Sequence, residues 1–171
     1  PFKKFLGAFN MLIGAGASSR ISLRLGEGYR DRAEKILGNA FTLTLLVSAV
    51  IITFSLLFLD KILVLFGGSE NTLKYAREFM VIIIPGTVLS ALLFGFNSIM
   101  RASGYPKKAM VTMIISAIVN ITLAPIFIFV LDMGIGGAAH ATNIAFFVGM
   151  VWVMSHFINK KSNLQLQIKN L

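Results

Sequence analysis

Polar side chains recur at every fourth residue in one of the most apolar parts of the chain. Thr112, Ser116 and Asn120 share one helix face at this spacing, and Ala124 follows on the same face. Pro125 has no amide hydrogen, so a carbonyl one turn earlier loses its helical donor. Such a carbonyl beside a polar stripe can bind a cation or polar substrate where lipid cannot reach it. The alternative, which applies above all to Thr112 and Ser116, is that these side chains only join neighbouring helices.

A second apolar stretch contains Pro85 and Gly86. Proline and glycine are common causes of sharp helix kinks, so a bend is expected there. We interpret Pro85, Gly86 and Pro125 as candidate hinges of a unit that flexes. Many buried membrane helices carry such pairs without any gating role, and this alternative stays open.

His140 is the one histidine placed well inside an apolar stretch, with Thr142 close by. Ionisable side chains within membranes are costly and are candidates for ion or proton pathways. An imidazole that titrates near neutrality suits proton coupling. His140 is therefore a candidate, although its closeness to Gly136 and Gly137 also fits a solvated place at the outer interface. His156 is expected at the inner interface.

Nothing in the sequence assembles a catalytic site. The chain has no Cys, which excludes disulfides and thiolate metal sites. No Ser-His-Asp set or metal cluster falls at a common depth. All seven acidic residues lie in loops or at the ends of apolar stretches. We predict a protein that is not an enzyme and has no metal or other cofactor.

The elements that carry these residues are long and apolar. Four stretches lack Asp, Glu, Lys and Arg altogether, namely 40–59, 79–100, 109–131 and 133–155. Each is close to the roughly 20 residues that a helix needs to cross a bilayer. Hydrophobic residues make up 56% of the chain, charged residues 13%, and the mean hydropathy is +0.81. The sequence predicts an all-α integral membrane protein, a transmembrane helix bundle embedded in the lipid bilayer.

A fifth apolar stretch, 5–19, is short for a span, and the chain begins at Pro1. We interpret it as the surviving part of a span, and the whole chain as a single membrane-domain fragment. The expected spans cover residues 5–22, 36–59, 75–100, 108–131 and 136–157.

The formal charge of +9 would suggest nucleic acid as the partner of a soluble domain. Here, however, the 16 Lys and Arg residues lie between the spans, with eleven on one side and five on the other. Basic loops stay in the cytoplasm. The distribution predicts a multi-pass protein of the plasma membrane, such as the cell inner membrane, with residues 26–35, 106–108 and the tail from Asn159 cytoplasmic. No nucleic-acid partner is expected.

Two of these cytoplasmic turns are alike. Residues 28–33 (GYRDRA) and 104–109 (GYPKKA) share Gly, Tyr, a basic residue and Ala at the same offsets. Glycine can adopt the left-handed conformation that ends a helix, and basic side chains favour the negative end of the helix dipole. The pattern arises either by convergent loop chemistry or from a duplicated helical hairpin.

Several strings in the right order give the chain a family resemblance. They are 13–16 (IGAG), 21–26 (ISLRLG), 101–110 (RASGYPKKAM), 120–130 (NITLAPIFIFV), and 133–139 (MGIGGAA) with 141–142 (AT). Together they resemble the MATE (multidrug and toxic compound extrusion) transporters over nearly the whole chain.

The resemblance implies a larger protein. Members of the family look like two six-helix lobes around a V-shaped cavity, and exchange H⁺ or Na⁺ for organic cations or drugs. This chain would supply part of helix two through helix six of the N-terminal lobe, without helix one and the C-terminal lobe. The resemblance also places Asn97, Asn120 and Thr142 at a shared chamber, with His140 and Ser116 as further candidates.

One position departs from the family pattern. Where the family typically has an acid that helps to bind the coupling cation, directly before the proline, this chain has Ala124. Coupling through this lobe would then need an acid from helix one, or His140, or would occur in the other lobe. Multidrug efflux is the leading function. The alternatives are a flippase for lipid-linked saccharides from the same wider group, and a membrane scaffold that transports nothing.

Overall fold

The computed structural model describes residues 2–65, 70–159 and 162–167, with the side chains of 2–11 and 70–72 left out. All regular elements of this described part are helical, which confirms the predicted class. In chain order they are α1 (Phe2–Gly26), α2 (Arg30–Leu57), α3 (Leu59–Leu65), α4 (Glu70–Ile83), α5 (Thr87–Ala102), α6 (Pro106–Pro125), the π-helix η1 (Ile126–Val130) and α7 (Gly134–Ile158).

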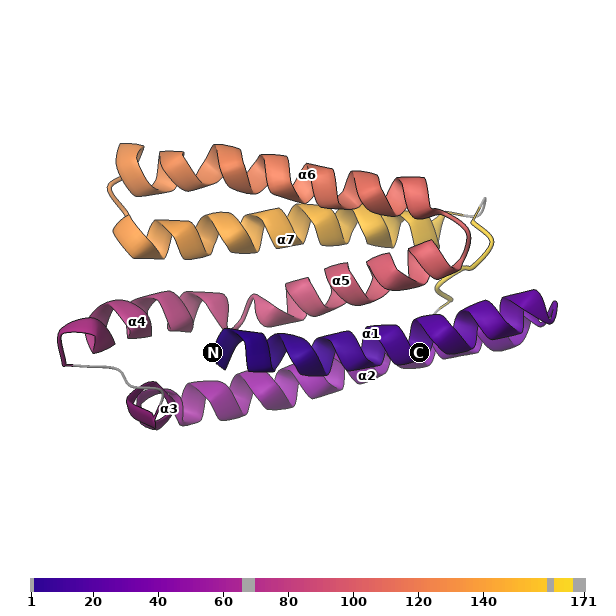
Figure 1. Cartoon of the computed structure of the whole chain (residues 1–171), viewed down its shortest axis with the longest axis horizontal. Helices are drawn as coiled ribbons and strands as arrows, with labels where there is room; N and C mark the ends of the chain where they lie inside the picture. Colours follow the sequence, from indigo (N-terminus) through magenta and orange to yellow (C-terminus); the bar gives the residue numbers. More distant parts are fainter. Residues whose placement is uncertain (1, 66–69, 160–161, 168–171) are drawn as a thin grey trace.

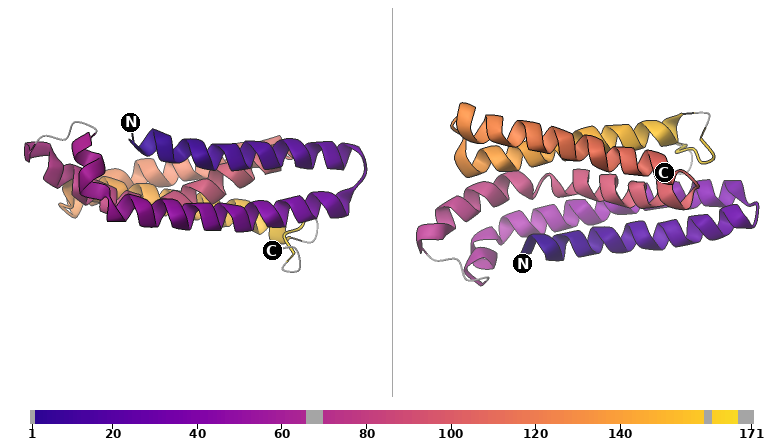
Figure 2. Two further views of the ribbon diagram at one scale, coloured as in Figure 1. Left: turned by 90° about the horizontal axis from the view of Figure 1, so that it is seen from below. Right: turned by 45° about the horizontal axis from the view of Figure 1, so that its top comes forward.

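The long helices lie side by side along one axis (Figure 1). Helices α1 and α2 form an antiparallel pair, α6 and α7 form another, and α5 packs between the two pairs (Figure 2). The α1–α2 turn, the α5–α6 turn and the end of α7 lie at one end of the bundle, and α3 and the η1–α7 turn lie at the other. The basic turns therefore share one end, as the charge count predicts.

Within the described residues, three helices are long and apolar enough to cross a membrane, namely α2, α7 and α6 with its extension η1. A bent pair of helices, α4 and α5, is the fourth candidate there. The sequence predicts one helix over 75–100, but α4 and α5 meet at an angle of 54°. Pro85 and Gly86 lie in the turn between them, so the expected bend is sharp enough to separate two helices.

The turn after Pro125 has a different form. Here the helix continues, but it widens into η1, and the N–H of Leu131 donates to the Ile126 carbonyl over 2.9 Å, five residues back. The π-helix is rare and occurs mostly as single turns of this kind within α-helices. The short helix α3 has no counterpart among the predicted elements. Its Leu59 and Leu63 are buried against Ile84 of the α4–α5 turn.

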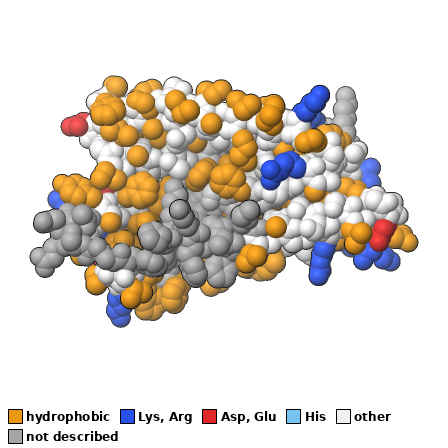
Figure 3. Space-filling model, viewed as in Figure 1, with side chains coloured by type: hydrophobic (Ala, Val, Ile, Leu, Met, Phe, Trp, Pro, Cys, Tyr) orange, Lys and Arg blue, Asp and Glu red, His pale blue; other side chains and the backbone are white. Residues whose placement is uncertain are grey.

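Glycines allow the helices to approach closely. A Cβ placed on Gly14 of α1 would lie 2.6 Å from the Cα of Gly95 in α5, and one on Gly137 of α7 would lie 2.7 Å from the Phe127 carbonyl oxygen. Small residues let membrane helices meet backbone to backbone, where dispersion and Cα–H···O contacts replace the hydrophobic effect. The outer surface is correspondingly apolar, and Lys and Arg gather mainly at the end with the basic turns (Figure 3).

The two similar turns have the same backbone. Gly28 and Gly104 have φ of 81° and 92°, the left-handed conformation predicted for them. In each turn the N–H of the following tyrosine donates to a carbonyl five residues back. A basic side chain three residues after the tyrosine then lies over its ring: Arg32 over Tyr29 at 4.8 Å and Lys108 over Tyr105 at 5.1 Å from the centroid. Such cation–π contacts stiffen the turn.

Candidate functional site

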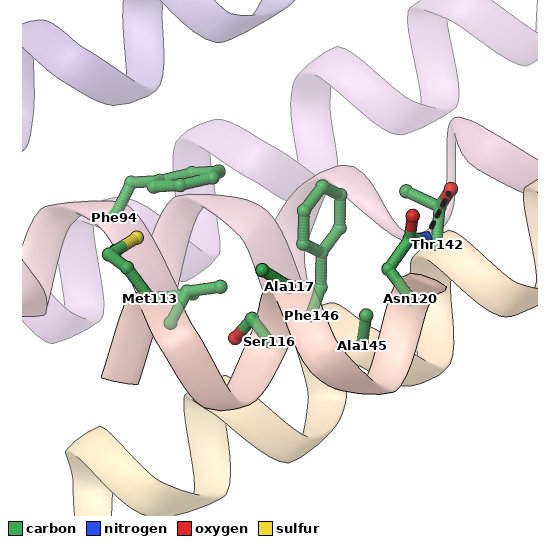
Figure 4. A pocket seen from close by; sticks show the side chains of 9 residues that line it. Phe94, Met113, Ser116, Ala117, Asn120, Thr142, Ala145 and Phe146 are labelled. Atoms are coloured by element: carbon green, nitrogen blue, oxygen red, sulfur yellow. Dashed lines mark hydrogen bonds between the residues drawn. The ribbon is translucent and has the colours of Figure 1, made fainter. Parts of the chain in front are cut away.

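A cavity of about 260 Å³ lies between α5, α6 and α7. Its lining combines the polar stripe of α6 with apolar and aromatic side chains from both neighbours (Figure 4). The lining residues are Leu93, Phe94, Met113, Ser116, Ala117, Asn120, Thr142, Ala145 and Phe146. We call this cavity the stripe pocket.

Asn120 and Thr142 join α6 to α7 within the pocket. The side-chain amide of Asn120 donates from Nδ2 to Oγ1 of Thr142 over 3.3 Å, and the threonine hydroxyl donates to the Ala138 carbonyl over 2.8 Å. The two side chains point toward one another (Figure 4). One of the two Nδ2 hydrogens of Asn120 and the hydroxyl proton of Thr142 are used in these bonds. The second Nδ2 hydrogen is left as a donor for a bound partner, and the Oδ1 of Asn120 and the second lone pair of Thr142 are left as acceptors.

Ser116 lies one turn along the stripe and is almost fully buried. Its hydroxyl has no hydrogen-bond partner, and a Cβ on Gly149 of α7 would lie 2.1 Å from that oxygen. The glycine is therefore what admits the serine at this crossing. Thr112, the first residue of the stripe, is fully buried and donates to the Lys108 carbonyl of its own helix.

The aromatic part of the pocket comes from α5 and α7. The rings of Phe94 and Phe146 pack edge to face, with centroids 5.7 Å apart and planes at 74°. Phe94 is 48% exposed. None of the nine lining residues is charged. The pocket thus offers π faces, a flexible Met113 and an amide–hydroxyl pair, which suits a flat, largely apolar molecule with a polar or cationic group.

Two other predicted residues lie elsewhere. Asn97 is 2% exposed and donates from Nδ2 to the Ala109 carbonyl over 2.8 Å, so it links α5 to the first turn of α6 outside the stripe pocket. His140 is exposed on α7 and does not line the pocket. Ala124 lies half-buried one turn beyond Asn120, also outside the lining. The structure therefore brings together Asn120, Thr142 and Ser116.

The break between α4 and α5 is held by a residue that the sequence did not single out. Asn143 of α7 donates from Nδ2 to the Ile82 carbonyl over 2.7 Å. Its Oδ1 is buried without a hydrogen-bond partner, and a Cβ on Gly86 would lie 1.9 Å from that oxygen. Gly86 is therefore needed for space, since its φ of −69° is open to any residue. The one indication in the sequence that Asn143 matters is its position next to Thr142.

The segment after α7 folds back onto the bundle. Residues 162–167, which we call the strap, contact the buried carboxylate of Glu34 in α2. Glu34 accepts from the Gln165 N–H at 3.2 Å, from Gln167 Nε2 at 2.8 Å and from Arg30 Nε at 3.2 Å. Leu164 is fully buried. The strap therefore ties α2 to the end of α7. Sequence reasoning could not find this, because its partners are separated by about 130 positions.

The sequence of this helical bundle matches a known family. The model of the MatE family matches residues 1–126, and the chain belongs to this family of membrane transporters, the multidrug and toxic compound extrusion proteins. The family consists of transporters, not enzymes, and the chain is accordingly a multi-pass helical protein of the plasma membrane.

Individual relatives agree with this. The chain is 29% identical to "Multidrug export protein MepA" of Staphylococcus haemolyticus over 170 residues, 99% of this chain and 38% of that protein. It is 27% identical to the "FAD transporter" of Shewanella oneidensis over 154 residues, 88% of this chain and 34% of that one. A solved inward-facing MATE transporter superposes with a TM-score of 0.92 at 25% identity, covering 99% of this chain and 39% of that one. The chain thus spans under two fifths of the length of these relatives.

Proposed function

We propose that this chain forms the N-terminal lobe of a multidrug efflux transporter that exports organic cations or drugs in exchange for H⁺ or Na⁺, with the stripe pocket on the substrate path. The observation that carries the proposal is the Asn120–Thr142 pair, 3.3 Å apart, beside the Phe94–Phe146 edge in an otherwise apolar bundle. The amide and the hydroxyl line a cavity and do not only fill a helix contact, so they can also bind the polar group of a substrate.

Aromatic rings suit cationic cargo because their faces carry partial negative charge. In the proposed cycle, Phe94 and Phe146 contact the flat part of the drug, while the free Oδ1 of Asn120 accepts a hydrogen bond from it. The break at Pro85–Gly86 and the π-turn after Pro125 flank the helices that carry the pocket. They are the proposed hinges for changes in pocket shape during exchange.

The coupling ion needs a separate source. The stripe pocket has no carboxylate among its lining residues, and Ala124, one turn beyond Asn120 and outside the lining, offers none either. The proposal therefore puts coupling at His140 or on parts of the protein outside this chain. Ala124→Asp tests this: in a wet cavity the new carboxylate should change the pH or Na⁺ dependence of efflux at an unchanged protein level. Facing lipid, it would cost about 2.5 to 3.5 kcal/mol and mainly reduce the amount of folded protein.

A second candidate is export of a neutral or anionic aromatic molecule. The observation that favours it is the same lack of charge among the lining residues, since a cation-selective pocket usually carries an acid. The deciding experiment expresses the protein in cells without other drug pumps and compares efflux of ethidium with export of a flavin nucleotide. Efflux of ethidium alone supports the leading proposal. Export of the flavin alone supports the second, and export of neither contradicts both.

A further inference from the structure

A second hollow, of about 220 Å³, lies at the end of the bundle that carries the basic turns. The ends of α5, α6 and α7 and the start of the strap line it, with the residues Met100, Lys108, Trp152, Ser155, His156, Asn159 and Ser162. It shares no lining residue with the stripe pocket. We call it the basal hollow.

The polar lining of the basal hollow is suited to an anion. Lys108 is exposed near the N-terminal end of α6, and none of the seven lining residues is Asp or Glu. Ser162 adds a hydroxyl group, whose Oγ lies 3.2 Å from Nε2 of the buried His156, while the Ser155 hydroxyl donates to the Trp152 carbonyl over 2.7 Å. A lysine ammonium with a hydroxyl group, next to the positive end of a helix dipole, favours phosphate oxygens.

Exposed apolar side chains lie in and beside the hollow. Trp152 is 43% exposed, and Val151 beside it is 48% exposed. Val111, one turn from Lys108 toward the bilayer centre, is 36% exposed. Tryptophan concentrates at membrane interfaces because its ring is amphipathic. A free phosphate ion would use only the polar half of this site, whereas an amphiphile would use both.

We infer that the basal hollow binds the phosphate group of an anionic phospholipid of the cytoplasmic leaflet, with Lys108 as the ionic contact and Trp152 beside the acyl chains. The negative charge of such a lipid complements the protein, because the chain carries a net charge of +9 and the basic turns share this end of the bundle. Basic pockets between transmembrane helices on the cytoplasmic side bind anionic headgroups. The inference does not depend on the proposed transport function.

Native mass spectrometry of the purified protein tests it, with phosphatidylglycerol and phosphatidylcholine added separately. Phosphatidylglycerol should bind more tightly. Lys108→Gln should weaken that binding about fivefold, which is about 1 kcal/mol at 1.4 kcal/mol per tenfold. Lys107→Gln is the matched control, because Lys107 is also exposed and is adjacent but does not line the hollow. Lys108→Arg should retain the affinity.

Two results would overturn the inference. If Lys107→Gln and Lys108→Gln weaken phosphatidylglycerol binding equally, the lipid is attracted to the basic end of the bundle as a whole and not to the hollow. Full displacement of the lipid by inorganic phosphate, together with unchanged lipid binding in Trp152→Ala, would indicate a site for a soluble anion. If Lys108→Gln does not fold, the inference is tested by lipid binding of three other variants, Lys108→Arg, Trp152→Ala and Lys107→Gln. Of these three, only Trp152→Ala should bind the lipid more weakly.

Discussion

The side chain of Asn143 supplies a hydrogen-bond donor to the Ile82 carbonyl, 2.7 Å away, in the last turn of α4. Carbonyls in a last helical turn have no intrahelical donor, and in a membrane no water replaces it. Helix α7 therefore supplies a donor to a backbone carbonyl at the break between α4 and α5. The same helix carries Thr142 of the stripe pocket. The residue that contacts the break, Asn143, and the pocket residue Thr142 are thus neighbours on α7.

Gly86→Ala should disrupt this contact, because the new Cβ would lie 1.9 Å from Asn143 Oδ1. We expect the free energy of unfolding in detergent to fall by about 1 to 3 kcal/mol. The double variant Gly86→Ala/Asn143→Ala should lose less than the sum of the two single changes, since the clash is gone.

Gly16→Ala is the control for this series, because nothing lies within 4 Å of a Cβ at that position. It should be close to neutral in thermal unfolding. Strict additivity of Gly86→Ala and Asn143→Ala would show that the two residues do not meet as described.

Ser116→Ala should leave stability unchanged or raise it by up to about 1 kcal/mol, because the buried hydroxyl it removes has no partner. The same change should rescue Gly149→Ala in part, since a Cβ at 149 would meet the Ser116 hydroxyl first and the flexible end of Leu93 second. Thermal unfolding of the two single variants, the double variant and the unchanged protein measures both effects. A large loss from Ser116→Ala alone would reveal a hydrogen bond or ligand at that hydroxyl.

The helices and the polar stripe could be predicted from the sequence, because both follow from the spacing of residues along one helix. Four-residue spacing fixes a shared helix face, so Ser116 and Asn120 had to point the same way. It could not decide what each side chain meets. Asn97, expected at the chamber, donates to a neighbouring backbone instead, and Asn143 bridges to a carbonyl 61 positions away. Such contacts depend on how helices cross, which no local pattern encodes.

Glu34→Ala should release the strap, because the carboxylate accepts hydrogen bonds from both Gln165 and Gln167. With Leu164→Cys as the reporter in this Cys-free chain, maleimide labelling should be slow with Glu34 present and fast in Glu34→Ala. Asp31→Ala is the control, since Asp31 is exposed one turn earlier on α2. Equal labelling in all three backgrounds would mean that Glu34 does not hold the strap.

The membrane orientation follows from the basic turns and is open to direct test. Single cysteines at Lys107 and Asp132 report on opposite ends of the bundle. In intact cells an impermeant maleimide should label Asp132→Cys, and it should label Lys107→Cys only after permeabilisation. Labelling of Lys107→Cys from outside would reverse the orientation and remove the cytoplasmic leaflet as the source of lipid for the basal hollow.

The most direct test of the stripe pocket is efflux of a cationic dye by Asn120→Leu. The change removes the hydrogen bond to Thr142 and the free Oδ1 but keeps a side chain of similar size. We expect efflux to fall by at least about fivefold, the equivalent of one hydrogen bond of about 1 kcal/mol, with the protein level unchanged. Thr122→Leu, a polar-to-apolar change at an exposed position of the same helix, should transport normally. Normal efflux by Asn120→Leu at a normal protein level would contradict the assignment of this pocket to the substrate path.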